Sequence, residues 1–351
     1  MKLFPIYGII LVVFMEVGGI LMCVKIAVVN TGISRSLAQS LNVIGGLSYL
    51  TNFEDKCVEL LGNIYDEIGT GTKILNIINR YVEDSNYYII KIFDENNRTN
   101  TMSLEMVLDY LAELDVDIIN LSISFDNMDM NKIVPLCEKL RDKGKILIIP
   151  YENNIYEISK LNNVITVKGD IFDNEESYEF IEDNNELFMK TSIIPVLSYN
   201  HKDEPCFYGG LGKATSIVTG IIANIINNNP NIDYNEIKRK LRVNSKAPIK
   251  NNYLYSNGKY TKFEEYLDFN TNFHALQILN GFCDYLDVSG DFLLTHRLKD
   301  TKKYFNEVDI INLIKIIENI ENVKVNLKEF SIKDSEWIYS LLNYAELNTC
   351  M

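Results

Sequence analysis

Four polar residues of this 351-residue chain stand at or near places where a buried strand ends or a helix begins. They are Asn30, Thr70, Asn153 and Ser216. Such places are where α/β proteins collect ligands and catalytic groups. The hydroxyl of Ser216 would become a nucleophile only beside a base that takes its proton, and an anion must hold that base. Asn30 cannot supply the anion and Thr70 cannot act as a base near neutral pH, so the sequence predicts no proton relay.

Two of the surrounding segments resemble, in the same order, motifs of the subtilisin-like serine proteases (subtilases). Lys25–Gly32 is similar to the strand that ends in Asp-Ser/Thr-Gly, with Asn30 in place of the catalytic aspartate. Gly69–Thr72 is similar to Gly-His-Gly-Thr, with Thr70 in place of the catalytic histidine. The resemblance therefore implies a subtilisin-like fold in which two members of the catalytic triad are replaced.

The segment Gly209–Gly220 resembles the nucleophile motif Gly-Thr-Ser-Met-Ala-x-Pro-His-Val-Ala-Gly in either of two registers. The gapless register puts Gly212 at the nucleophile position. The alternative puts Ser216 there but deletes four residues from the helix that follows. Such a deletion would rotate the buried face of the helix and shorten it by one turn, so we favour Gly212.

The resemblance also implies where a peptide groove would lie. Val116–Ser122 is similar to one wall of the substrate groove, and Ile146–Asn154 to the strand whose asparagine, here Asn153, donates to the oxyanion. Phe125 and Glu152 replace small residues and are expected to narrow or charge the first specificity pocket. The implied groove residues are Ser122, Ile123, Ser124, Phe125, Tyr151 and Glu152.

The function that follows from the resemblance is that of a pseudoprotease, a catalytically inactive member of the fold that binds a peptide or protein. An active subtilase or a precursor peptide in peptide maturation is the partner expected. Two alternatives stay open: an active serine endopeptidase that uses Ser216 with an atypical triad, and a membrane-tethered assembly protein. His201 precedes the nucleophile motif, and we interpret it as a surface loop residue rather than a replacement base.

Apolar runs alternate with helical patterns from residue 25 to residue 241, which predicts an α/β domain with a mostly parallel sheet covered on both faces. We expect this three-layer domain to span residues 23–250, with short antiparallel strands within 170–200. Residues 251–351 predict a small helical C-terminal region. Its stretch from Asn306 resembles part of an acyl or peptidyl carrier domain, in which Glu307 and Val308 replace the residues that would hold the phosphopantetheine arm.

The composition limits the remaining functions. A formal charge of −14 without a Lys/Arg-rich stripe predicts no nucleic-acid surface. Six scattered cysteines and three histidines predict reduced thiols and neither a metal site nor a cofactor.

The first 22 residues differ from the rest of the chain, because residues 3–22 are almost entirely apolar with Glu16 in their middle. They fit a membrane or signal anchor, or an apolar extension ahead of a start at Met22. The chain is accordingly expected to be cytoplasmic, or membrane-associated if residues 3–22 form an anchor.

Overall fold

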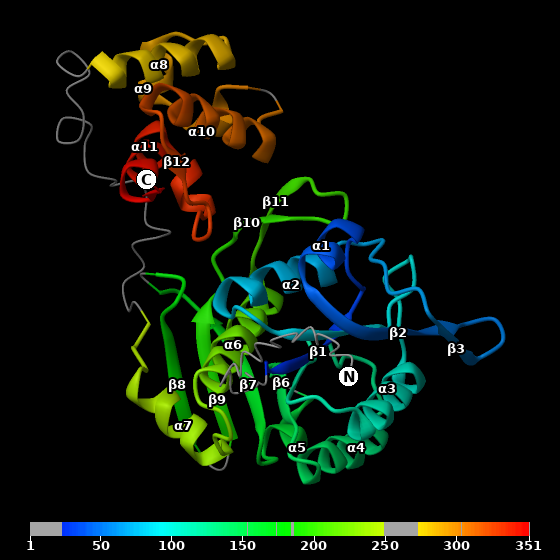
Figure 1. The fold of residues 1–351 in the computed structure, drawn as a ribbon. Coiled ribbons are helices and arrows are strands. Elements are labelled where there is room, and N and C mark those ends of the chain that lie inside the picture. The colour runs from blue at the N-terminus through cyan, green and yellow to red at the C-terminus, as the bar shows by residue number, and fades with distance from the viewer. Residues whose placement is uncertain are drawn as a thin grey trace, which may run out of the picture.

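The computed structural model describes residues 23–152, 154–172, 174–183, 186–248, 273–302 and 304–350. Residues 1–22 and Asn153 lie outside these ranges. Figure 1 shows a large α/β domain below a smaller, mostly helical C-terminal region. The predicted α/β class is confirmed in three layers, as a subtilisin-like fold requires, and so is the helical C-terminal region.

The centre of the large domain is a nine-stranded sheet in the order β3-β2-β4-β1-β5-β6-β7-β9-β8. Seven strands are parallel, and the edge strands β3 and β8 run antiparallel to their neighbours. The bounds are β1 Lys25–Asn30, β2 Asn42–Asn52, β3 Cys57–Leu61, β4 Asn86–Lys91, β5 Ile118–Asn120, β6 Ile146–Pro150, β7 Val164–Asp170, β8 Tyr178–Asp183 and β9 Glu186–Ser192.

Helices cover both faces of the sheet (Figure 1). One face is packed by α1 (Arg35–Ser40), α2 (Thr70–Tyr81), α6 (Gly210–Asn227) and α7 (Tyr234–Val243). The other is packed by α3 (Thr101–Glu113), α4 (Met130–Asp142) and α5 (Tyr156–Ser159). A parallel sheet needs this double cover because both of its faces are apolar.

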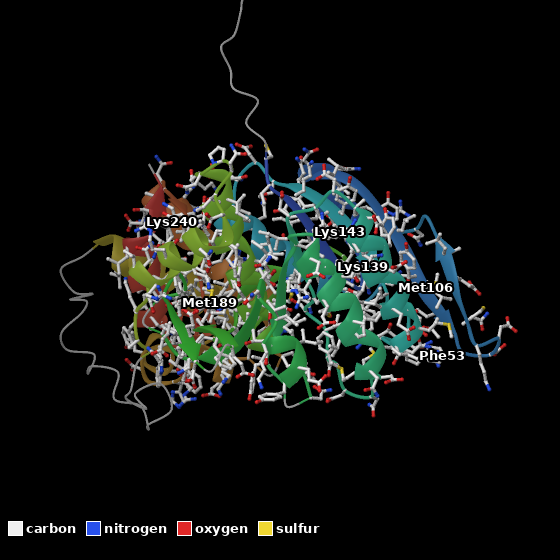
Figure 2. All side chains as sticks on the ribbon, turned by 90° about the horizontal axis from the view of Figure 1, so that it is seen from below. Phe53, Met106, Lys139, Lys143, Met189 and Lys240 are labelled. Carbon is white, nitrogen blue, oxygen red and sulfur yellow. The ribbon has the colours of Figure 1, made fainter. Side chains whose placement is uncertain are left out.

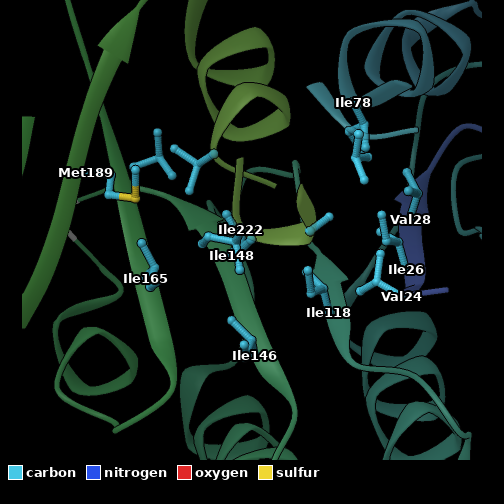
Figure 3. Packing of buried hydrophobic residues seen from close by; sticks show 14 of the residues in the cluster. Val24, Ile26, Val28, Ile78, Ile118, Ile146, Ile148, Ile165, Met189 and Ile222 are labelled. Carbon is cyan, nitrogen blue, oxygen red and sulfur yellow. The ribbon is translucent and has the colours of Figure 1, made fainter. Parts of the chain in front are cut away.

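Side chains alternate along β1 between the two cores, as the period of a strand requires. Ile26 and Val28 belong to the core under α2 and α6, whereas Ala27 and Val29 belong to the core under α3 and α4. Figure 3 shows the first core, where Ile78 of α2 and Ile222 of α6 approach the strands. The even positions of β1 end at Asn30, so this side chain lies under α2 and α6 too.

A short hairpin of β10 (Val196–Tyr199) and β11 (Pro205–Tyr208) leads into α6. The C-terminal region follows with α8 (Phe273–Leu286), α9 (Gly290–Thr295), η2 (Leu298–Asp300), α10 (Glu307–Glu321), β12 (Lys324–Val325), η3 (Ile332–Ser335), α11 (Ile338–Leu347) and β13 (Thr349–Cys350). Its core includes Leu197 from the hairpin, and Phe207 packs against it. The hairpin is therefore shared by both parts of the molecule.

Ion pairs join α3 to α4 on the outer surface, where Figure 2 labels Lys139 and Lys143. Lys139 pairs with Asp109 and Glu113, and Lys143 pairs with Glu113. Both lysines thus have an acidic partner on the neighbouring helix.

The sequence prediction missed several short elements, among them β3 and α5 of the large domain and α9 of the C-terminal region. The edge strand β3 is mostly exposed, so its apolar residues lack the alternation that marks a half-buried strand. Helix α5 is only one turn long and has no periodic signal to detect. The short strands expected within 170–200 are present, but β9 extends the parallel sheet rather than forming a separate antiparallel unit.

Candidate functional site

Asn30 lies at the C-terminal end of β1 and is 3% exposed. Its Nδ2 donates to the carbonyl of Ser122 at 2.8 Å, which ties β1 to the chain after β5. Its Oδ1 has no hydrogen-bond partner among the described residues. An amide at this position acts as a structural donor, and it offers no negative charge to orient a base.

Thr70 is the first residue of α2, and the helix start is pressed against the turn after β1. Gly71 donates its amide to Thr31 Oγ1 at 2.7 Å, and a Cβ at Gly71 would overlap the carbonyl of Gly32. Gly69 before the helix has a φ of +98°, a left-handed conformation that favours glycine. The two glycines therefore bring position 70 close to the end of β1.

The Asp66 carboxylate binds the main chain at the start of α2. Its carboxylate accepts hydrogen bonds from the amides of Ile68, Gly69 and Thr72 and from the Thr72 hydroxyl, at 2.7–3.0 Å. Burial alone would raise the pKa of Asp66, but these hydrogen bonds outweigh it and hold the pKa below its ordinary value. Asp66 is a charged helix cap that sequence reasoning missed, although an acidic residue just ahead of a helical pattern is a recognised start signal.

Gly212 lies in the first turn of α6, in agreement with the helix that the gapless register assumed. A Cβ at this position would overlap the hydroxyl of Tyr208, the last residue of β11. Burial raises the pKa of Tyr208 far above its ordinary value, so this hydroxyl stays protonated and is no nucleophile near neutral pH. The space that a side chain at position 212 would need is filled by an inert phenol.

Ser216, the alternative nucleophile, is fully buried one turn into α6. Its Oγ donates to the carbonyl of Gly212 at 2.7 Å, a bond along its own helix. The hydroxyls of Thr215 and Thr219 bond in the same way to carbonyls four residues earlier. Ser216 therefore belongs to a series of helix-bonded hydroxyls, and its geometry offers no route to a substrate.

A buried ion pair lies next to Gly212. Lys213 is 1% exposed, and its ammonium binds Glu175, the carbonyl of Ile194 at 2.5 Å and Ser192 Oγ at 3.4 Å. Ser192 in turn donates to Glu175 at 3.0 Å. Burial lowers the pKa of Lys213, against the opposing effect of Glu175. A lone lysine within the apolar helical pattern was the available signal for this pair.

The two predicted walls of the groove are bonded to each other. The amide of Phe125 donates to Glu152 Oε2 at 2.8 Å, and Asn154 Nδ2 donates to the carbonyl of Phe125 at 2.8 Å. Side chains of one wall thus occupy the main-chain groups of the other. An extended peptide would need those same groups in order to pair with residue 125.

The side-chain assignments within the groove need a correction. Ile123 and Phe125 are buried in the core under α3 and α4, so the prediction that they line a groove was wrong. Ser124 and Tyr151 are exposed, while Ser122 and Glu152 are half-buried. Alternation along an extended segment explains the difference, since every second side chain points inward. Asn153, the expected oxyanion donor, lies outside the described residues.

His201 lies in the turn of the β10–β11 hairpin and packs on the start of α2. A Cβ at Gly69 would be 2.9 Å from His201 Nδ1, and this buried nitrogen has no hydrogen-bond partner among the described residues. The interpretation of His201 as a surface loop residue was therefore incomplete. Tertiary packing brings it beside position 70, yet no carboxylate of the described part of the chain bonds to its Nδ1.

Among the described residues, no three His, Cys, Asp or Glu side chains are arranged to hold a metal ion. Within the same residues, no helix has both the length and the apolar character needed to cross a bilayer.

No family model matches the sequence, and no curated protein matches it. Solved structures do resemble the fold. The epidermin leader peptide processing serine protease EpiP from Staphylococcus aureus is 12% identical with a TM-score of 0.46, over 58% of this chain and 65% of that chain. A cold-adapted subtilisin-like serine proteinase is 13% identical with a TM-score of 0.47, over 63% of this chain and 81% of that one. The chain thus spans less than two thirds of EpiP, and TM-scores below 0.5 say nothing about its activity.

Proposed function

We propose that this chain is a catalytically inactive protein of subtilisin-like build that binds a peptide or protein partner. A precursor peptide or an active subtilase is the partner class that the sequence resemblance implies. The observation that carries the proposal is the Tyr208 hydroxyl, which occupies the space beside Gly212, the residue that the sequence resemblance assigns to the nucleophile position. Asn30 supports it independently, because its amide is committed to Ser122 as a donor.

The missing groups are enough to abolish turnover. Loss of the serine or the histidine of subtilisin lowers turnover by about 10⁶, and what remains comes from the oxyanion hole and binding. In this chain the three positions hold Asn30, Thr70 and Gly212. A scaffold that lacks the catalytic groups could still bind a peptide but would not cleave it.

The alternative of an active endopeptidase using Ser216 has no support from geometry, since the Ser216 hydroxyl is buried and bonded to Gly212. A membrane-tethered role would depend on residues 3–22, which lie outside the described residues.

The activity half of the proposal is tested with a fluorophosphonate probe and with casein as substrate, on the full chain and on Ser216→Ala. We expect no labelling and no hydrolysis by either protein. Casein hydrolysis that disappears in Ser216→Ala would overturn the proposal.

The binding half is tested with fluorescent random decapeptides, measured by polarisation against the full chain and followed by mass spectrometry. We expect saturable binding of a subset of peptides that remain uncleaved. Failure of every peptide to bind would leave an inactive scaffold without the proposed peptide-binding role.

A further inference from the structure

The C-terminal region is joined to the large domain by a strand contact. Leu197 of β10 donates its amide to the carbonyl of Phe330 at 2.8 Å, and Ile332 donates to the carbonyl of Pro195 at 3.0 Å. Val196 and Ser331 face each other between these bonds as an antiparallel bridge. Residues 330–332 therefore lie along the edge of β10 through one antiparallel bridge, between the turn at 328–329 and the start of η3.

Arg80, in the last turn of α2, secures both strands of this contact. Its Nη1 donates to the carbonyl of Lys328 at 2.6 Å, and its Nη2 donates to the carbonyl of Leu197. The guanidinium has donors on two sides of a rigid plane, which suits it to hold two main-chain carbonyls at once. Arg80 of the large domain thus binds main-chain carbonyls of this contact, and such a contact does not depend on the side chains of the bound segment.

One side chain gives the contact its specificity. Phe330 is fully buried, stacks on Phe207 of β11 at 6.4 Å between ring centroids and meets Tyr344 of α11 edge-on at 4.9 Å. Leu197 is 2% exposed in the same cluster. The neighbouring Ile332 is 46% exposed, so its backbone and not its side chain makes the contact.

These contacts contrast with the groove predicted from the sequence, where Glu152 and Asn154 occupy both main-chain groups of Phe125. The groove is closed by its own walls, whereas the β10 edge exchanges two main-chain hydrogen bonds with a segment of the C-terminal region. Strand addition of this kind takes its affinity from main-chain bonds and its selectivity from alternate side chains.

We propose that the edge of β10, with Arg80 and Phe207, is the peptide-docking site of this protein, occupied in the free chain by its own residues 328–332. The external ligand is an extended peptide with an aromatic residue at the place of Phe330, which binds by displacing this internal segment. This inference rests on the proposed peptide-binding function and assigns its site.

The test uses a synthetic peptide with the sequence of residues 326–334, in which a photoreactive benzoylphenylalanine replaces the phenylalanine. Crosslinks to the full chain are mapped by mass spectrometry. The variant Ile332→Pro removes only the amide that bonds to Pro195, because this exposed residue begins η3, where proline is tolerated. Ile332→Val keeps the amide and is the matched control.

Loss of one hydrogen bond of about 1 kcal/mol corresponds to a roughly fivefold change in an equilibrium. We expect crosslinks to the β10–β11 hairpin in all three proteins, with about five times more in Ile332→Pro than in wild type or Ile332→Val. Crosslinks confined to residues 122–125 and 151–152 would overturn the β10 site while upholding peptide binding. Equal labelling of Ile332→Pro and Ile332→Val, or no crosslink in any protein, would overturn the inference.

Discussion

At the scale of single residues, the site is defined by side chains that fill space or complete a charge pair. Tyr208 fills the volume beside Gly212, and Glu175 neutralises Lys213 inside the protein. Neither arrangement resembles a catalytic relay, because the Tyr208 hydroxyl is held beside a glycine and the Lys213 ammonium is bound by Glu175 and the Ile194 carbonyl.

The overlap between Tyr208 and position 212 gives a double-mutant test. Gly212→Ala forces a methyl group into the Tyr208 hydroxyl, and overpacking of this kind costs about 1–3 kcal/mol. In a Tyr208→Phe background the hydroxyl is gone and only the ring carbon stays in tight contact, and alanine is the better helix former, so the same substitution should lower the free energy of unfolding much less. Chemical denaturation of the wild type, the two single variants and the double variant measures the coupling free energy between positions 208 and 212. An equal loss of unfolding free energy on Gly212→Ala in both backgrounds would contradict the prediction.

The buried ion pair gives a second test at this scale. Lys213→Met leaves Glu175 buried without its cation, which should lower the free energy of unfolding by about 3–5 kcal/mol. Adding Glu175→Gln removes the uncompensated charge and should restore a large part of this loss. Thermal and urea unfolding measure it, and a double variant no more stable than Lys213→Met would show that the pair is not the cause.

At the scale of elements, α2 organises the site. Its first residue is Thr70, its start is capped by Asp66, and its last turn holds Arg80 against the C-terminal region. This single helix therefore connects Thr70, which the sequence resemblance assigns to the triad, to the proposed docking edge.

The cap of α2 predicts a dependence on pH. Because folding lowers the pKa of Asp66, its carboxylate stabilises the fold above the ordinary aspartate value of about 3.9, and this stabilisation is lost as the pH falls through the lowered pKa. Asp66→Asn should lower the free energy of unfolding by about 2 kcal/mol at pH 7 and by much less in strong acid. Urea unfolding across the pH range measures it, with Asp55→Asn in the exposed β2–β3 turn as control. A cost unchanged by pH would argue against a charged cap.

At the scale of the whole molecule, the large domain and the C-terminal region share the β10–β11 hairpin, and acidic residues of both lie near their interface. Glu329, in the turn before Phe330, is influenced by the charges of Glu176 and Glu175 of the large domain and of Asp334, with Lys328 as the opposing cation. Burial and then these carboxylates raise the pKa of Glu329. A raised pKa means that the docked state binds the proton more tightly, so docking should strengthen as the pH falls.

The raised pKa of Glu329 predicts how Glu329→Gln changes the melting temperature. Removing the charge should raise the melting temperature at pH 7 and above, and should flatten its dependence on pH. Differential scanning calorimetry between pH 5 and pH 9 measures both effects. Glu95→Gln, at an exposed loop residue, provides the control. A pH profile identical to that of Glu95→Gln would exclude Glu329 as the responsive group.

The sequence by itself determined the α/β class and the alternation of elements. Local patterns suffice for these, because strand and helix periods are written in consecutive residues. Residues 25–30 and the helix through 212–227 needed no tertiary information to be recognised.

Only the tertiary structure decided what surrounds those residues. The Tyr208 hydroxyl beside Gly212, the bonds between Phe125 and Glu152, and the docking of Phe330 on β10 each join groups whose partners no local pattern specifies. Phe125 was misassigned for the same reason, since an extended segment at the end of a strand buries alternate side chains. Which side becomes the buried one depends on the helices packed against it.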